Sequence, residues 1–161
     1  MRAFKIKGIS IAIIILLFVV SASCSSPSSI TTTTSPPGLN TIKIANKPVT
    51  GDYLVDQNGF SLYYTTQDSP GVSNINDPGV LYSWPIFYTP NVIVPSQLNT
   101  IDFYSITKHD NRMQTAYQGW PLYYYLNDKA AGDMNGDGLN GIWFLARLSD
   151  FASLSTQYVT P

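Results

Sequence analysis

The sequence predicts an all-β protein, a compact antiparallel domain of two pseudo-repeated β units with at most one short helix near the C-terminus. Three observations predict this class. All ten acidic residues are Asp, and the 161-residue chain contains 11 Gly and 11 Pro. Asp, Gly and Pro favour turns, whereas Glu favours helices. Eleven tyrosines, all after residue 50, supply aromatic side chains of the kind found in strands, and the third observation is an internal repeat.

The N-terminus has the pattern of an export signal. Three basic residues precede an apolar run at 9–20, and small residues follow up to Cys24. The run is too short for a comfortable membrane span but suits the core of a signal peptide. A small-residue run that ends in Cys resembles a bacterial lipobox, with Ser21 where Leu or Val is usual. We therefore expect residues 1–24 to be a lipoprotein-type signal, with an ordinary cleavable signal or an uncleaved anchor as alternatives.

Two further segments follow the signal. Residues 25–40 are rich in Ser, Thr and Pro and carry no charge, so they cannot bury enough surface to offset their ordering entropy. We expect a tether there and a β domain at 41–161. Without the signal, six Lys and Arg stand against ten Asp. Nucleic acid is not an expected partner, because this balance gives no phosphate-binding field.

Short runs of alternating apolar residues between turn residues predict strands throughout the β domain. Asn58-Gly59 lies between two such runs and is a strong hairpin signal. One short helix is expected near 149–154, with Ser149 as its cap. No strand alternates with a long helical stripe, so a βαβ fold is not expected. In chain order, the expected strands are 42–44, 53–55, 60–65, 80–88, 91–94, 101–106, 113–117, 121–126 and 141–147.

The chain repeats itself at an offset of 60 residues. Gly59–Asp68 aligns with Gly119–Asp128, with the Gly, the Leu, two Tyr and the Asp identical, and Trp84 aligns with Trp143 one residue out of step. Two copies of this length are too few for a solenoid, so we infer two pseudo-symmetric β units that share one core. The two units span about 52–88 and 102–147.

Each copy of the repeat contains a Tyr and, five residues later, an Asp. In a strand, Tyr123 faces the opposite side from Tyr124, and Asp128 falls just past the strand end, where a carboxylate fixes a turn. A buried Tyr needs a partner for its hydroxyl group. We therefore expect a structural contact between Tyr123 and Asp128, and another between Tyr63 and Asp68, with a ligand site as the alternative.

Residues 123–128, Tyr-Tyr-Tyr-Leu-Asn-Asp, fit the pattern Yx(FWY)xxD, with Tyr125 at the aromatic position, whereas the first copy has Thr65 there. With the neighbouring block at 114–124, the chain resembles the secreted repeat lipoproteins that carry this motif, a family of unknown function. The resemblance implies an all-β envelope lipoprotein and supplies no reaction. Many members have a Cys pair that is missing from 72–83 here, so no disulfide or redox role is inherited.

A loop in the second unit has the spacing of a calcium site. Asp133, Asn135 and Asp137 stand at alternate positions before Gly138, as in calcium loops. An EF-hand needs an acid at the twelfth position, where this chain has Phe144, and a Gly/Asp/Asn turn needs the same residues. We expect no cofactor, with Ca²⁺ at these three side chains as the open alternative.

Few residues suit catalysis. His109 is the only His, and a single His without Cys or a Ser elbow motif makes no triad, so we expect no enzyme. Aromatic side chains suit contacts with a protein or a glycan. We expect an extracytoplasmic lipoprotein, anchored to the cell membrane through Cys24, with a non-enzymatic binding or envelope-associated structural domain. The alternative is a calcium-stabilised adhesion or glycan-binding module. The residues singled out for binding or structure are Tyr63, Asp68, Trp120, Tyr123, Tyr125, Asp128 and Trp143.

Overall fold

The computed structural model describes residues 41–157. The expected signal at 1–24, the tether at 25–40 and Cys24 lie outside these residues. The described part of the chain consists of short strands and short helices. In order, they are β1 Ile42–Lys47, β2 Gly51–Asp56, β3 Tyr63–Thr65, α1 Pro78–Ser83, η1 Thr100–Asp102, β4 Phe103–Thr107, β5 Met113–Tyr117, β6 Trp120–Pro121, η2 Leu139–Gly141, β7 Trp143–Leu145 and α2 Leu148–Gln157.

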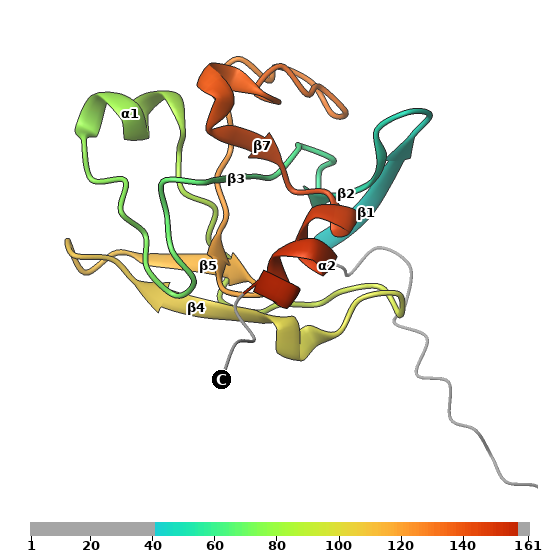
Figure 1. Ribbon diagram of the computed structural model, residues 1–161, viewed down its shortest axis with the longest axis horizontal. Coiled ribbons are helices and arrows are strands. Elements are labelled where there is room, and N and C mark those ends of the chain that lie inside the picture. The colour runs from blue at the N-terminus through green and yellow to red at the C-terminus, as the bar shows by residue number, and fades with distance from the viewer. Residues whose placement is uncertain (1–40, 158–161) are drawn as a thin grey trace, which may run out of the picture. The chain divides into compact units, whose positions relative to one another are not determined.

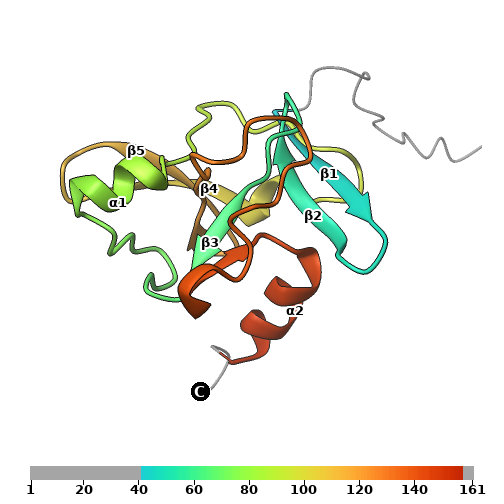
Figure 2. The same cartoon turned by 90° about the horizontal axis from the view of Figure 1, so that it is seen from above.

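The strands pair antiparallel throughout the described residues, which confirms the all-β class. β1 pairs with β2, β3 pairs with β7, and β4, β5 and β6 form a three-stranded sheet. The β1–β2 and β4–β5 hairpins point away from each other (Figures 1 and 2). The strands expected at 42–44, 53–55, 101–106 and 113–117 are present as β1, β2, β4 and β5.

The expected turn at Asn58-Gly59 is also present. Gly59 has a φ of 90°, a value that Gly adopts without the strain other residues meet. Its N–H donates to the carbonyl of Asp56 at 3.0 Å, and the Asp56 side chain accepts from the N–H of Phe60 at 2.9 Å. The turn thus returns the chain along β2 towards β3.

Helix α1 replaces the strand expected at 80–88. The Asp77 side chain accepts from the N–H groups of Gly79 and Val80 at 2.8 and 3.0 Å, and Pro78 occupies the first helical turn. An Asp cap followed by Pro is a helix start signal. This local signal outweighs the apolar run behind it, so the strand prediction is wrong for the first part of this segment.

Three expected strands are shorter than predicted, and one is missing. Isolated bridges, such as Val55 with Ser61 and Tyr63 with Tyr123, continue the pairing where regular strands end. No strand forms at 91–94. The shortened strands are those expected at 60–65, 121–126 and 141–147, which are β3, β6 and β7.

The expected C-terminal helix is present as α2. It begins at Leu148, so Ser149 lies inside the first turn and the predicted cap is wrong. Phe151 on this helix is buried. Its ring packs against the rings of Tyr64 and Tyr117, with centroid distances of 5.1 and 4.8 Å. The helix therefore covers one side of the aromatic core.

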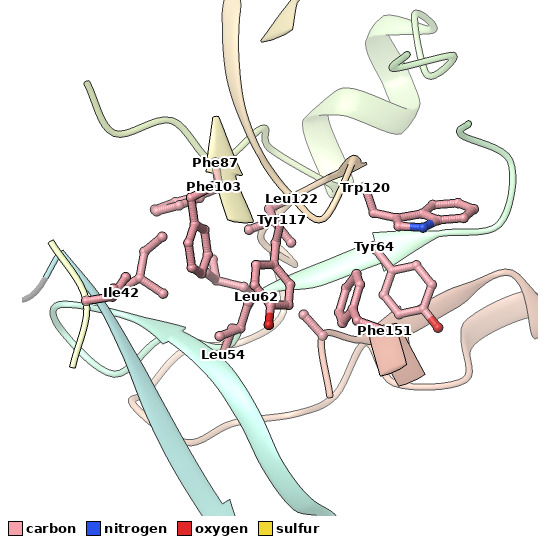
Figure 3. Packing of buried hydrophobic residues seen from close by; sticks show 12 residues of the cluster. Ile42, Leu54, Leu62, Tyr64, Phe87, Phe103, Tyr117, Trp120, Leu122 and Phe151 are labelled. Atoms are coloured by element: carbon pink, nitrogen blue, oxygen red, sulfur yellow. The ribbon is translucent and has the colours of Figure 1, made fainter. Parts of the chain in front are cut away.

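Successive residues of the central segments face two separate cores. Leu62 and Tyr64 lie in the first core, whereas Tyr63 between them lies in the second. The same alternation holds over Leu122–Tyr124, as the period of two in a strand requires. Figure 3 shows the first core, with Tyr64 beside Trp120. Both faces of these segments are thus buried, which explains why they are apolar at every position.

Each half of the domain contributes its last segment to the other half. In the first half (42–87), Leu54 donates to the carbonyl of Ala146 at 2.9 Å, and the Ala146 N–H donates to the carbonyl of Leu62 at 2.8 Å. Ala146 belongs to the second half (103–146). The equivalent contacts join Thr115 and Leu122 of the second half to Phe87 of the first, at 2.9 Å each.

Candidate functional site

The repeated Asp side chains bind the Tyr of the opposite repeat. The Tyr63 hydroxyl donates to Asp128 Oδ2 at 2.6 Å, and the Tyr123 hydroxyl donates to Asp68 Oδ2 at 2.8 Å. Both tyrosines are fully buried, and both carboxylates are nearly so. The expected kind of contact is present, but the expected pairing within one repeat is wrong. The reason is the exchange of segments, which places each Tyr beside the other copy's Asp.

Backbone N–H groups satisfy the second oxygen of each carboxylate. Asp68 Oδ1 accepts from the N–H of Asn74 at 2.6 Å. Asp128 Oδ1 accepts from the N–H of Asn135 at 2.9 Å. Both carboxylates therefore fix a loop on one side and a tyrosine of the other repeat on the other side.

Burial sets the protonation of these groups. It raises the pKa of Tyr63 and of Tyr123 well above the ordinary value, so both hydroxyls stay protonated and donate. Burial also raises the pKa of Asp68, against the opposing effect of the hydrogen bond from Tyr123. The arrangement is that of a structural contact, because no oxygen of either carboxylate is left without a donor.

The two tyrosines lie at a local pseudo-two-fold axis. Tyr63 and Tyr123 exchange both backbone hydrogen bonds, each at 2.9 Å. The glycines that precede them in the repeat, Gly59 and Gly119, have nearly the same φ values of 90° and 93°. The sequence repeat thus appears in space as two equivalent segments that pair antiparallel at their tyrosines.

Two tryptophans stack on each other beside the tyrosines. The rings of Trp84 and Trp143 are nearly parallel, at 4° and 3.9 Å between centroids. Trp84 packs edge-on against Tyr63 at 5.5 Å, and Trp143 packs edge-on against Tyr123 at 5.1 Å. Trp143 was among the residues expected at the site, and its alignment with Trp84 was the signal that both belong there.

The other aromatic candidates divide between the two cores. Tyr125 stacks on Trp84 with a centroid distance of 4.4 Å, so it belongs to the same cluster. Trp120 lies in the first core beside Tyr64, at 5.7 Å. The structure therefore brings Tyr125 to the Tyr–Asp pairs and places Trp120 elsewhere.

A buried lysine extends the network from Asp68. Lys108 is 3% exposed, and its Nζ donates to Ser73 Oγ at 2.6 Å and to the carbonyl of Ile75 at 2.7 Å. Ser73 Oγ lies 2.8 Å from the Tyr123 hydroxyl, which in turn binds Asp68. Burial lowers the pKa of Lys108, and the charge of Asp68 opposes that effect. Sequence reasoning missed Lys108, because a lysine in a polar hairpin turn gives no local signal of burial.

The calcium candidates have protein partners. Asp133 Oδ2 accepts from the backbone N–H groups of Lys129 and Ala130 at 2.8 and 2.9 Å, which lower the pKa of Asp133. Asp137 forms an ion pair with Arg147. Each of these carboxylates is therefore engaged with a different part of the chain.

Asn135 lies next to a Tyr–Asp pair. Its Nδ2 is 3.2 Å from Asp128 Oδ1 and donates to it, so the amide supports the carboxylate of the repeat. Within the part of the chain that the structure describes, no three His, Cys, Asp or Glu side chains gather in a way that would hold a metal ion. Calcium at this loop stays the alternative to the expected absence of a cofactor.

A surface cleft of about 490 Å³ opens beside the stacked tryptophans, and both Trp84 and Trp143 line it. Neither indole N–H is hydrogen-bonded within the described residues, and neither nitrogen is fully enclosed. Both donors are therefore open to a further partner. The polar side chains at the rim of this tryptophan cleft are Gln67, Asp77, Ser83 and Asn140.

Residues 105–147 match the family model of a secreted repeat of unknown function. The matched stretch contains Tyr123, Asp128 and Trp143, so it covers the second copy of the repeat. The resemblance inferred from the sequence is confirmed over this stretch, and the description as secreted agrees with an exported chain. No curated protein and no solved structure matches the chain. In the described residues, no helix has the length and apolar character needed to span a membrane.

Proposed function

We propose that the chain is a lipid-anchored extracytoplasmic protein whose β domain binds a component of the envelope or its surroundings without catalysing a reaction. The tryptophan cleft carries this proposal. Its volume of about 490 Å³ lies in the range of about 300–1,000 Å³ that is typical of small-molecule sites, and two tryptophans line it. The Tyr–Asp pairs are occupied inside the fold and are not available to a ligand.

The buried Ser73–Lys108 pair is the arrangement that has to be weighed against the non-enzymatic part of the proposal. A Ser next to a Lys of lowered pKa is a known arrangement for a nucleophile. Here Ser73 is buried, shares its hydroxyl with Tyr123 and does not line the tryptophan cleft. We expect a serine-reactive fluorophosphonate to leave Ser73 unlabelled. Labelling that disappears in Lys108→Met would contradict this part.

The membrane anchor is tested at Cys24. Mass spectrometry of the mature protein is expected to find a lipid-modified N-terminus at this residue. The matched variant is Cys24→Ser, which we expect to be released from the membrane fraction. A mature chain that starts elsewhere and carries no lipid would contradict the anchor and leave the binding domain untouched.

Binding is tested by sedimentation with isolated cell envelopes. The mature chain carrying Cys24→Ser removes the lipid as a cause of association and is expected to sediment with the envelopes. Adding Gln67→Ala and Ser83→Ala at the cleft rim is expected to reduce the sedimented fraction. The matched control is Gln97→Ala, an exposed glutamine in a different surface cleft. Equal sedimentation of rim and control variants would contradict a function at this cleft.

A further inference from the structure

The two indole N–H groups of the second core are donors open to a further partner. Trp84 and Trp143 are only 5% and 2% exposed, yet neither N–H has a partner among the residues described. Donors on buried side chains in native proteins are nearly always paired, with protein or with something bound. Both residues line the tryptophan cleft, so a molecule bound there that offers acceptor atoms can pair with these donors.

The rest of the cleft is lined by polar side chains together with Val80 and Ile142, and it carries no positive charge. Its lining includes the amides of Gln67 and Asn140 and the hydroxyl of Ser83, and it contains no Lys, Arg or His. Its one carboxylate, Asp77, already accepts from two N–H groups of α1 through Oδ1. An anionic ligand would meet no compensating charge here. A neutral ligand rich in hydroxyl and carbonyl groups fits these donors and acceptors.

The backbone at the cleft offers little to an extended peptide. The Thr66 N–H already donates to the carbonyl of Ile142 at 3.0 Å. The carbonyl of Gln67 accepts from Asn74 Nδ2 at 2.9 Å. A peptide that adds a strand needs free backbone groups along an edge, and these groups are already used. Side-chain amides, a hydroxyl and aromatic edges are instead the groups available for recognition.

We propose that the tryptophan cleft binds a neutral glycan whose oxygen atoms accept hydrogen bonds from the indole N–H groups of Trp84 and Trp143. The rim amides then serve as donors and acceptors for its hydroxyl groups, and the apolar ring edges contact its carbon skeleton. This inference rests on the proposed binding function and names the class of ligand for it. The two donors stand at equivalent positions of the two repeats, so the exchange of segments between the halves builds the site.

The experiment follows the three indole N–H signals of the mature Cys24→Ser chain by ¹H–¹⁵N NMR. The probes are two neutral trisaccharides, chitotriose and maltotriose, added up to about 10 mM, which detects dissociation constants near 1 mM. At least one probe is expected to move the signals of Trp84 and Trp143. Trp120 is the internal control, because it lies in the first core, and its signal is expected to stay in place.

A rim variant separates recognition from folding. Gln67 is exposed, so Gln67→Ala is expected to keep the fold and to weaken binding about three- to tenfold, the effect of one lost hydrogen bond. Gln97→Ala is expected to bind like the unaltered chain. Two neutral glycans that leave both signals unmoved would overturn the proposal. So would an anionic trigalacturonate that binds as tightly, or an uncharged tripeptide that alone moves these signals.

The result is distinguishable from a failure of the binding function itself. Envelope sedimentation that depends on the cleft rim, without any response to neutral glycans, would keep the function and remove the glycan. Glycan binding at the two indoles without envelope sedimentation would support the ligand class and contradict the envelope as its source.

Discussion

The buried Tyr–Asp pairs show how a hydroxyl and a carboxylate can be placed inside a core with every carboxylate oxygen paired. Both Asp68 oxygens and both Asp128 oxygens accept hydrogen bonds. A buried group that loses its partner costs about 1–3 kcal/mol. Because the partners come from opposite halves, each pair ties the two halves together and fixes a loop at the same time.

The cross-repeat pairing predicts a specific energetic coupling. Tyr63→Phe and Asp128→Asn are each expected to lower the free energy of unfolding by about 1–3 kcal/mol. Their double-mutant cycle is expected to show a coupling energy of about 0.5–3 kcal/mol, as for residues in contact. The measurement is urea unfolding of the two single variants and the double variant.

The matched control uses the pair that sequence proximity would favour. Tyr63→Phe and Asp68→Asn are expected to be additive within about 0.5 kcal/mol, because Tyr63 binds the other carboxylate. Strong coupling in this second cycle and none in the first would restore the pairing within one repeat.

Asp68 gives the fold a pH dependence on the acid side. Burial raises its pKa in the folded state, so the folded protein binds this proton more tightly than the unfolded chain. The contribution of Asp68 to stability therefore increases as the pH falls through its folded pKa. It is smallest at neutral pH, and its slope is at most about 1.4 kcal/mol per pH unit.

Lys108 is expected to hold this pKa down, because its charge favours the ionised carboxylate. In Lys108→Met, the midpoint of the Asp68 side-chain carboxyl signal in a ¹³C NMR titration is expected to move to higher pH. Lys43→Met removes a charge from β1, where Lys43 contacts Gln57 instead, and is expected to leave the midpoint unchanged. A downward shift in Lys108→Met would contradict the network.

At the scale of elements, local patterns predicted much of the fold. Alternating apolar residues indicated β1, β2, β4 and β5, and the polar Asn58-Gly59 indicated a turn. The prediction failed at α1, where the Asp77 cap and Pro78 start a helix that a run-based pattern does not detect. The short strands were overestimated for another reason. Residues buried on both faces are apolar throughout, so their pattern does not show where regular pairing ends.

The loop before β7 is expected to tolerate no added methyl group at Gly136. A Cβ there would lie 2.7 Å from Trp84 Cη2 and 3.1 Å from the Cβ of Tyr125. Both neighbours belong to the stacked cluster and have little room to move, so Gly136→Ala is expected to cost about 1–3 kcal/mol. The measurement is the melting temperature of the variant.

Gly79→Ala is the matched control, because it replaces a Gly by Ala as well and stiffens the backbone in the same way. Gly79 lies in helix α1, and its nearest contact for an added Cβ is the Asp77 side chain at 3.1 Å. Ala is favoured over Gly in a helix by about 1 kcal/mol, so this variant is expected to be no less stable than the unaltered chain. A Gly136→Ala protein that melts like the Gly79→Ala protein would contradict the close packing.

The same loop is expected to hold its shape without calcium. Asp133 is engaged with backbone N–H groups and Asp137 with Arg147, so a cation would have to replace existing partners. We expect millimolar calcium to shift the melting temperature by no more than about 1 °C. A site filled at about 100 times its dissociation constant would add about 2.7 kcal/mol, several degrees. A rise of that size that a chelator reverses would establish the calcium alternative.

At the scale of the whole domain, the exchange of segments is the feature that sequence could not indicate. The repeat itself was visible as an alignment, and so were the residue types of the Tyr–Asp pairs. An alignment of two copies, however, does not say which copy a residue contacts. Long-range pairing such as Tyr63 with Leu145 depends on how the chain crosses between the halves.

The exchange makes each half incomplete without the other. Cut between Gln97 and Leu98, the N-terminal fragment keeps Tyr63 but loses β7 and Asp128, and the C-terminal fragment keeps Tyr123 but loses Phe87 and Asp68. Each fragment alone is therefore expected to show no cooperative unfolding transition as a monomer, whereas an equimolar mixture is expected to recover one. Circular dichroism and analytical ultracentrifugation measure both. A monomeric fragment that melts cooperatively by itself would show that a half forms its own core, and that the Tyr–Asp pairs join two finished units instead of completing them.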